Sequence, residues 1–134
     1  VDLRSVGEQL RVQFESAAQD RGLKLTVTAA GVVETDRVLL GLVVAGLTAN
    51  AVDHSAGPEV AVRLEATATG WDAEILDGGP GFPESVAAEL EHPPRLGDTM
   101  KGLGIPLARL AADVLGATIT WDVQGRARVL VRKP

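Results

Sequence analysis

The longest apolar stretch of the chain is the feature that most narrows its possible folds. From Val38 to Ala49 the sequence is almost entirely Leu, Val, Ala and Gly, and Asp36, a residue suited to capping a helix N-terminus, stands just before it. The stretch reaches His54, where Ser-Ala-Gly-Pro breaks it. It is too long for a strand and too short to span a bilayer. We therefore predict a helix over 36–54 that is buried on most of its sides.

Length and composition set the class of protein. A chain of 134 residues is about one ordinary domain, so we predict a single domain over 1–134. Its 18 acidic and 13 basic residues give a formal charge of −5, which has the wrong sign for binding nucleic acid. With 3% aromatic residues, base stacking on exposed rings is disfavoured as well. Because the first residue is Val1 and not Met, we expect a piece of a longer protein.

Other periodic segments flank the apolar helix. Apolar residues at helical spacing predict a helix over 2–21, with a stripe formed by Leu3, Val6, Leu10, Phe14 and Ala17. Further helices are predicted at 84–90 and from Pro106 to Gly116. Alternating segments predict five strands, around residues 23–28, 60–64, 71–75, 119–123 and 129–131. The second and third of these form an antiparallel hairpin turning at 67–70. Together these helices and strands predict an α+β fold of two layers.

Polar residues interrupt the end of the buried helix. Asn50, Asp53 and His54 are spaced i, i+3 and i+4, so they share one face. That face is a candidate site. Taken alone, the pattern also fits a helix end that turns toward solvent.

A glycine-rich turn, Asp-Gly-Gly-Pro-Gly at 77–81, directly follows a predicted strand. Glycines let the backbone approach a flat ligand closely, and an Asp at a strand end can accept a hydrogen bond from an exocyclic amine. An ordinary tight turn is the alternative interpretation. A third segment, Lys-Gly-Leu-Gly at 101–104, leads into a helix and offers free backbone N–H groups to a phosphate, although a lone GxG is weak evidence.

The order and spacing of these three segments resemble the catalytic, ATP-binding domain of sensor histidine kinases. This domain belongs to the GHKL superfamily, which includes gyrase and the heat-shock ninety chaperones. The resemblance covers essentially the whole chain. It implies a Bergerat fold, which is a two-layer α/β sandwich with a mixed sheet of about five strands covered on one face by about three helices. It also implies a mobile ATP lid at about 82–101.

The resemblance assigns roles to matching positions. Asn50 would coordinate Mg²⁺, and Asp77 would accept a hydrogen bond from the adenine amino group. His54 would lie near the nucleotide, and Lys101 is a candidate phosphate contact by its position. The remaining nucleotide contacts would come from backbone around the adenine and the triphosphate, at Gly79, Gly81, Gly102, Leu103 and Gly104.

Four positions depart from the family pattern. Gly46 stands where relatives have Asn, or a Glu that activates water, so the chain lacks that general base. Asp53 replaces a common Lys or Arg, and a carboxylate beside a triphosphate weakens binding unless a metal intervenes. Met100 and Arg126 replace a frequent Gly and Thr.

His92 does not resemble a phosphoacceptor, and the two histidines do not resemble a zinc site. His92 precedes Pro93 and Pro94, which forbid the helix on which the family carries its phosphorylated histidine. We therefore interpret His92 as a lid residue. With two distant His and no Cys, a zinc site has no support.

The predicted function is transfer of the ATP γ-phosphoryl group to a histidine on a dimerisation domain outside this chain. The resemblance implies Mg·ATP as cofactor, a response regulator as partner, and a cytoplasmic domain whose parent is membrane-anchored or soluble. Neither nucleic acid nor direct membrane contact is expected, and without its dimerisation domain the chain is expected to be inactive. The alternatives are a degenerate module that docks a partner, a serine kinase acting on an anti-sigma antagonist, and a gyrase-like ATPase.

Overall fold

The computed structural model describes residues 1–55, 57–77, 104–122 and 127–134. Along the chain the described elements follow in the order α1-β1-α2-β2-β3-α4-β4-β5. The helices are α1 (Leu3–Asp20), α2 (Arg37–His54) and α4 (Gly104–Leu115). The strands are β1 (Lys24–Ala30), β2 (Glu59–Ala66), β3 (Trp71–Asp77), β4 (Thr118–Asp122) and β5 (Ala127–Lys133). The predicted helix at 84–90 and the ATP lid lie outside the described residues.

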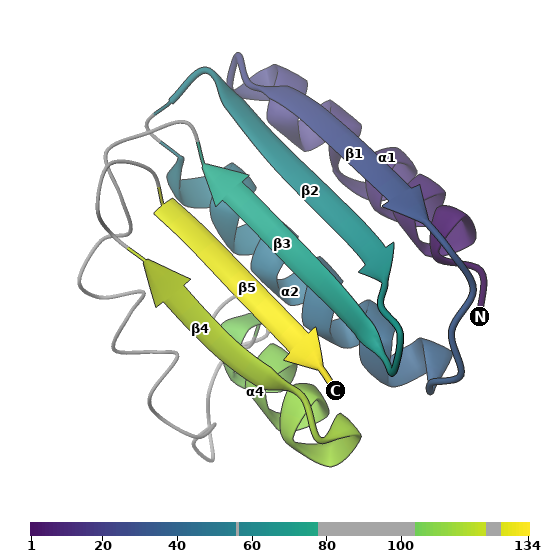
Figure 1. Ribbon diagram of the computed structural model, residues 1–134. Helices are drawn as coiled ribbons and strands as arrows, with labels where there is room; N and C mark the ends of the chain where they lie inside the picture. The colour runs from purple at the N-terminus through teal and green to yellow at the C-terminus, as the bar shows by residue number, and fades with distance from the viewer. Residues whose placement is uncertain (56, 78–103, 123–126) are drawn as a thin grey trace.

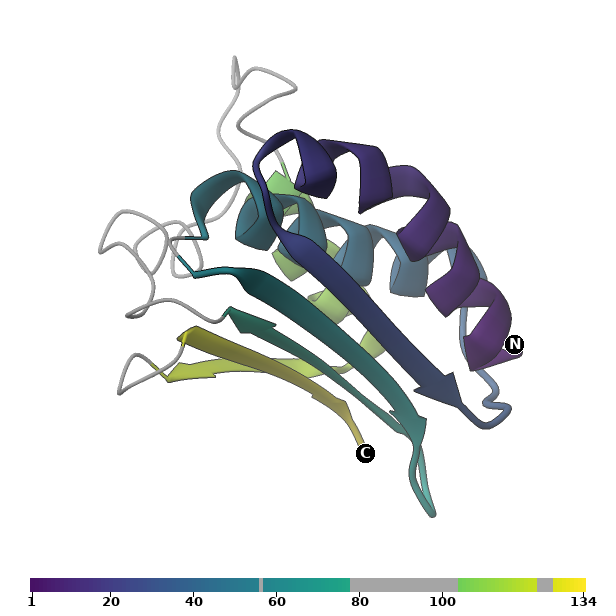
Figure 2. The same cartoon turned by 90° about the horizontal axis from the view of Figure 1, so that it is seen from above.

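The strands form one mixed, five-stranded sheet in the order β1-β2-β3-β5-β4 (Figure 1). β1 pairs in parallel with β2, and every other neighbouring pair is antiparallel. β2 and β3 form the predicted hairpin, in which Val62 lies opposite Ile75. All three described helices lie on the same face of this sheet, as Figure 2 shows. The predicted α+β fold with its two layers is therefore confirmed.

The first helix begins and ends where the sequence indicates, although its buried stripe shifts near the end. The Asp2 carboxylate accepts a hydrogen bond from the Arg4 backbone N–H at 3.0 Å, which caps the N-terminus. Ala17, which we predicted to be buried, is exposed, and Ala18 is buried instead. The chain turns back directly after the helix, where the N–H of Leu23 donates to the Ala18 carbonyl, and Leu23 and Ala18 both belong to the core.

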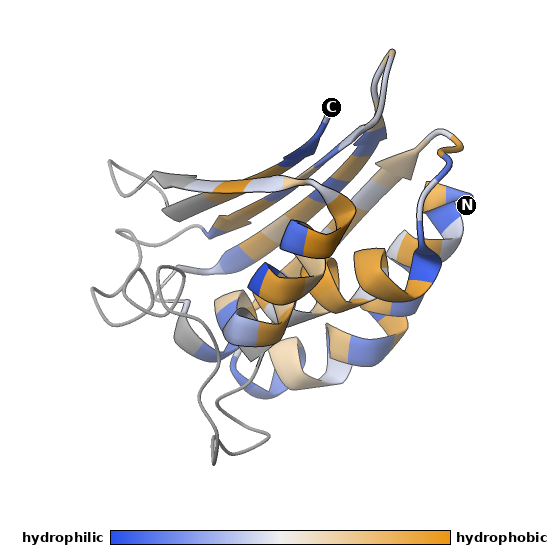
Figure 3. Cartoon of the chain, turned by 90° about the horizontal axis from the view of Figure 1, so that it is seen from below, coloured by the Kyte–Doolittle hydropathy of each residue, from blue (hydrophilic) through white to orange (hydrophobic). Residues whose placement is uncertain are grey.

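The central helix α2 contributes more buried apolar side chains to the core than any other described element, as its apolar sequence predicts. Asp36 caps it by accepting from the Leu39 N–H at 3.0 Å. Its fully buried side chains are Leu40, Val43, Val44, Leu47, Thr48, Ala51 and Val52. They pack between the sheet and the neighbouring helices, where Figure 3 shows the apolar residues concentrated. Val38, Leu42 and Asp53 are exposed, so the predicted burial on most sides holds for the other described side chains of the helix, which are buried or half-buried.

The other face of the sheet is polar because side chains alternate along each strand. On β2 and β3, Arg63 and Glu74 are directly opposed and form an ion pair at 3.5 Å. Asp72 pairs in the same way with Arg132 of β5 at 3.2 Å. Within the described residues, no helix is both long and apolar enough to cross a membrane.

Two glycines give a matched test of the packing. A Cβ on Gly70, in the hairpin turn, would lie 1.9 Å from the Lys133 carbonyl oxygen, whereas a Cβ on Gly41 in α2 would meet nothing within 4 Å. We expect Gly70→Ala to lower the free energy of unfolding by about 3 kcal/mol, because the backbone must move. Gly41→Ala should raise it by about 1 kcal/mol through helix propensity. Urea unfolding of both variants checks this, and equal effects of the two substitutions would contradict it.

Candidate functional site

The predicted site residues that the structure describes meet at one end of the sheet. β3 finishes there at Asp77, which is paired with Val60 near the start of β2 and with Ala127 at the start of β5. α2 ends close by, because only a short segment separates His54 from β2. α4 begins toward the same end, as Figures 1 and 2 show. The topology thus assembles a helix end, a strand end and a helix beginning that are distant in sequence.

Asp77 is the buried carboxylate of this end. The alternation of β3 places it on the face that holds Ala73 and Ile75, beneath the helices. Its residue exposure is only 4%, so the charge is largely shielded from water. A buried carboxylate needs hydrogen-bond donors to compensate for lost hydration. This end of the sheet therefore holds the Asp77 carboxylate itself as a strong hydrogen-bond acceptor in a fixed position.

Ser55 supplies one of those donors. Its hydroxyl group donates a hydrogen bond to Oδ1 of Asp77, and its own oxygen accepts from the Gly57 N–H at 3.2 Å. Ser55 is itself buried and stands at the C-cap of α2. Sequence reasoning gave Ser55 no role, although a hydroxyl residue that ends a buried helix is a usable signal.

Asn50 lies within the last turns of α2 and is 8% exposed. Asp53, predicted to share its face, is exposed, and the side chain of His54 lies outside the described residues. The buried Asn50 therefore contradicts, at this position, the alternative of a helix end that turns toward solvent.

Arg21, which follows α1 directly, binds the C-terminal end of α2 through its side chain. Its guanidinium group donates to the carbonyl oxygen of Val52, and to that of Ser55 at 3.4 Å. A cation at a helix C-terminus also interacts favourably with the helix dipole. This long-range contact, over more than thirty residues of sequence, has no local signal, so sequence reasoning missed it.

Several predicted contacts cannot be placed. The glycine-rich turn and phosphate segment, with Gly79, Gly81, Lys101, Gly102 and Leu103, lie outside the described residues, as do Met100, His92 and Arg126. Gly104 is described as the first residue of α4. These roles stay predictions.

The described residues contain no group of three or more His, Cys, Asp or Glu that could hold a metal ion. Mg²⁺ that arrives with a nucleotide does not need such a cage, since phosphates and water supply most of its ligands. One buried carboxamide oxygen, that of Asn50, is a suitable additional ligand. The residues present therefore fit a nucleotide-bound Mg²⁺ and not an independent metal centre in this part of the chain.

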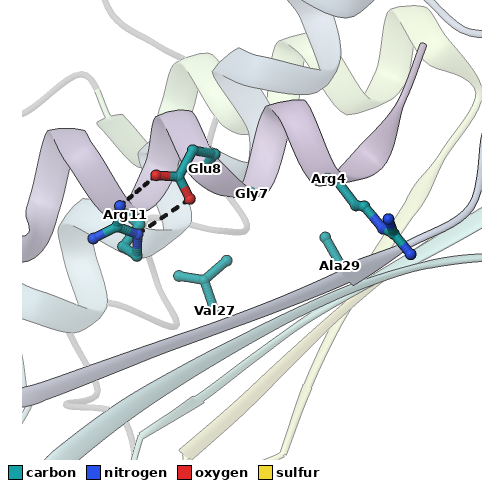
Figure 4. Close-up of a pocket in the computed structure, with 6 residues that line it drawn as sticks. All are labelled: Arg4, Gly7, Glu8, Arg11, Val27 and Ala29. Atoms are coloured by element: carbon teal, nitrogen blue, oxygen red, sulfur yellow. Dashed lines mark hydrogen bonds and ion pairs between the residues drawn. The ribbon is translucent and has the colours of Figure 1, made fainter.

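A separate hollow of about 200 Å³ lies between α1 and β1 (Figure 4). Gly7 lets the helix approach the strand closely there, because a Cβ would lie 3.0 Å from that of Ala29. Arg11 is paired with Glu8 and with Glu15, and its hydrogen bond holds the pKa of Glu8 below the ordinary value. In the hollow, Arg11 and Glu8 are thus paired with each other, whereas Arg4 has no ion pair among the described residues. The hollow is remote from Asp77 in the fold.

Residues 35–134 match the family described as histidine kinase-, DNA gyrase B-, and HSP90-like ATPases. Sensor protein CseC of Streptomyces coelicolor is 36% identical over 110 residues, which are 78% of this chain and 21% of that protein. The chain therefore spans about a fifth of the length of the curated relatives that it matches.

Solved structures share the fold. The histidine kinase AdeS of Acinetobacter baumannii aligns with a TM-score of 0.78 at 22% identity, over 98% of this chain and 64% of that one. The ATP binding domain of PrrB from Mycobacterium tuberculosis aligns with a TM-score of 0.69 at 24% identity, over 100% of this chain and 94% of that one.

The chain belongs to the family of histidine kinase-, DNA gyrase B-, and HSP90-like ATPases. The resemblance found in the sequence is thereby confirmed, together with the fold that it implied.

The contact of Arg21 with α2 predicts a measurable loss of stability. Arg21→Met removes the charged donor from two carbonyl groups, and we expect the free energy of unfolding to fall by about 1 kcal/mol. Amide hydrogen exchange in the last turn of α2 should accelerate. Arg4→Met, at an exposed arginine of α1 without an ion pair among the described residues, is the control. If both variants behave alike, Arg21 does not anchor α2.

Proposed function

We propose that this chain is the ATP-binding catalytic domain of a two-component sensor histidine kinase. It would donate the ATP γ-phosphoryl group to a histidine on a dimerisation domain outside the chain. The observation that carries this proposal is the buried, hydrogen-bonded Asp77 at the strand end, in a chain of this ATPase family. CseC and AdeS, which bear the names of a sensor protein and a histidine kinase, give further support.

Asp77 recognises adenine by accepting a hydrogen bond from its exocyclic 6-amino group. An ionised carboxylate only accepts hydrogen bonds, so it matches an amino group and opposes a carbonyl oxygen at that position. Burial strengthens this discrimination, because a mismatched ligand leaves a buried polar group without its partner. The base is therefore selected by one side chain and by the backbone around it.

Asn50 holds Mg²⁺ through its carboxamide oxygen. When bound, Mg²⁺ neutralises charge that develops on the phosphates during transfer. In the part of the chain that the structure describes, no hydrogen bond to another residue occupies the Asn50 side chain. Its amide is thus available for the metal without first breaking an internal contact.

The chain's contribution to phosphoryl transfer is positioning, because the nucleophilic histidine belongs to the partner domain. The N-terminus of α4, a helix of 12 residues, directs its dipole toward the triphosphate. Gly46 leaves α2 without the carboxylate base of hydrolysing relatives, so transfer is favoured over hydrolysis. The chain alone accordingly binds nucleotide without phosphorylating itself.

The remaining parts of the proposal extend beyond the described residues. A response regulator receives the phosphoryl group from the histidine, and the domain works in the cytoplasm. The further nucleotide contacts are His54, Gly79, Gly81, Lys101, Gly102, Leu103 and Gly104.

Nucleotide binding is tested by calorimetric titration with ADP and Mg²⁺. We expect saturable binding, and Asp77→Asn should weaken it at least tenfold, because the amide nitrogen of Asn donates toward the adenine amino group. Asp72→Asn changes the same chemistry on the opposite face of β3 and should leave affinity unchanged. Absence of heat at millimolar ADP would refute the proposal and favour a degenerate docking module.

Metal dependence tests the role of Asn50. Replacing Mg²⁺ with EDTA should weaken ADP binding to the unmodified chain about tenfold, through loss of charge neutralisation. In Asn50→Ala the difference between the two conditions should largely disappear. Asp53→Ala, at the exposed position nearby, should preserve the Mg²⁺ dependence. If Asn50→Ala also preserves it, Asn50 is not the metal ligand.

A further inference from the structure

We propose that Ser55 is a positioning residue that orients the Asp77 carboxylate for adenine recognition and so sets the selectivity of the site for a 6-aminopurine. The proposal rests on the proposed function, since it concerns the same ligand. It begins from one contact, the hydrogen bond in which the Ser55 hydroxyl donates to Oδ1 of Asp77. This contact joins the C-cap of α2 to the end of β3, over 22 residues of sequence.

The direction of this hydrogen bond is fixed by the neighbouring backbone. The Gly57 N–H donates to the Ser55 oxygen at 3.2 Å and uses one of its lone pairs. A hydroxyl group has a single proton, and a carboxylate oxygen acts as an acceptor. The Ser55 proton therefore points at the carboxylate, and the three groups form a directed chain from Gly57 to Asp77.

Ser55 is itself held in place by hydrogen bonds to both of its backbone polar groups. Its N–H donates to the Ala51 carbonyl at 2.9 Å, which continues the hydrogen bonding of α2. Its carbonyl accepts from Arg21 at 3.4 Å, and Arg21 also donates to Val52. At 4% exposure, the hydroxyl group has little access to competing water. The serine is thus a rigid donor on a rigid helix end.

A rigid donor restricts how the carboxylate can rotate. The Asp side chain turns about two bonds, and each orientation presents its oxygens differently to a ligand. A carboxylate offers about four acceptor positions, and the bond from Ser55 uses one of them, so this bond orients the carboxylate without excluding an amino group. Loss of Ser55 would leave Asp77 charged and buried but with a broader range of orientations. Selectivity for the amino group should then fall more than affinity for the rest of the nucleotide.

The test compares two ligands on the 134-residue chain with Mg²⁺. One is ADP, and the other is purine riboside 5′-diphosphate, which has hydrogen in place of the 6-amino group. In Ser55→Ala we expect ADP affinity to fall about tenfold while affinity for the analogue changes less than twofold. Ser55→Thr keeps the hydroxyl group and should restore the preference for ADP. Ser55→Cys, a weaker donor, should give an intermediate preference.

The outcomes separate this proposal from the proposed function. If unmodified chain binds ADP and Asp77→Asn abolishes its preference over the analogue, the function stands. An unchanged preference in Ser55→Ala would then overturn the role of Ser55 alone, as would equal losses for both ligands, which indicate only a structural role. If Ser55→Ala does not fold, a Ser55→Cys variant with the preference of unmodified chain overturns it. Failure of the unmodified chain to bind ADP overturns both.

Discussion

The packing of α2 against the sheet is the interaction on which the rest of the structure depends. Burial of a Leu or Val side chain contributes about 2 kcal/mol, and α2 buries Leu40, Val43, Val44 and Leu47 completely. The same helix contacts α1 on one side and α4 on the other, so both outer helices are positioned by it. Hydrophobic burial has no direction of its own, but the helix that it fixes ends at a defined point. Everything polar at the candidate site is arranged around that point.

The polar contacts at the end of α2 add what hydrophobic burial does not provide. Burial holds the helix against the sheet, whereas the directional hydrogen bonds fix the position of its end. Arg21 attaches the helix end to the turn after α1, and Ser55 attaches it to β3. A buried carboxylate such as Asp77 costs several kcal/mol without donors, so the serine hydroxyl both lowers that cost and fixes an orientation. Under the proposed function, the stability of this end of the fold and recognition of adenine depend on the same few hydrogen bonds.

The sequence predicted those parts of the fold that have a local physical signal. The sequence identifies Asp36 as a cap, and the alternation of β2 and β3 predicts their hairpin, because capping and period-two burial involve neighbouring residues. The shift from Ala17 to Ala18 was not predictable, since it arises where the chain folds back after the helix. The parallel pairing of β1 with β2 also escaped prediction, because it depends on α2 crossing between them. Arg21 and Ser55 were missed for the same reason, as both act across long sequence separations.

Asn50 and Asp77 illustrate why a motif can be more informative than its parts. Each segment alone also fitted an interpretation without a ligand, namely a solvent-exposed helix end for the segment with Asn50 and a tight turn for the segment that begins at Asp77. Their burial excludes the first alternative for Asn50, because polar side chains are seldom kept from water without a function or a partner. Thr48, two residues earlier, is fully buried as well, so the polar interruptions lie inside the molecule and do not mark its surface. A helix that buries polar groups on more than one of its sides loses some of the stability that apolar side chains would give there, and the nucleotide site that we propose at its end would be the compensating advantage.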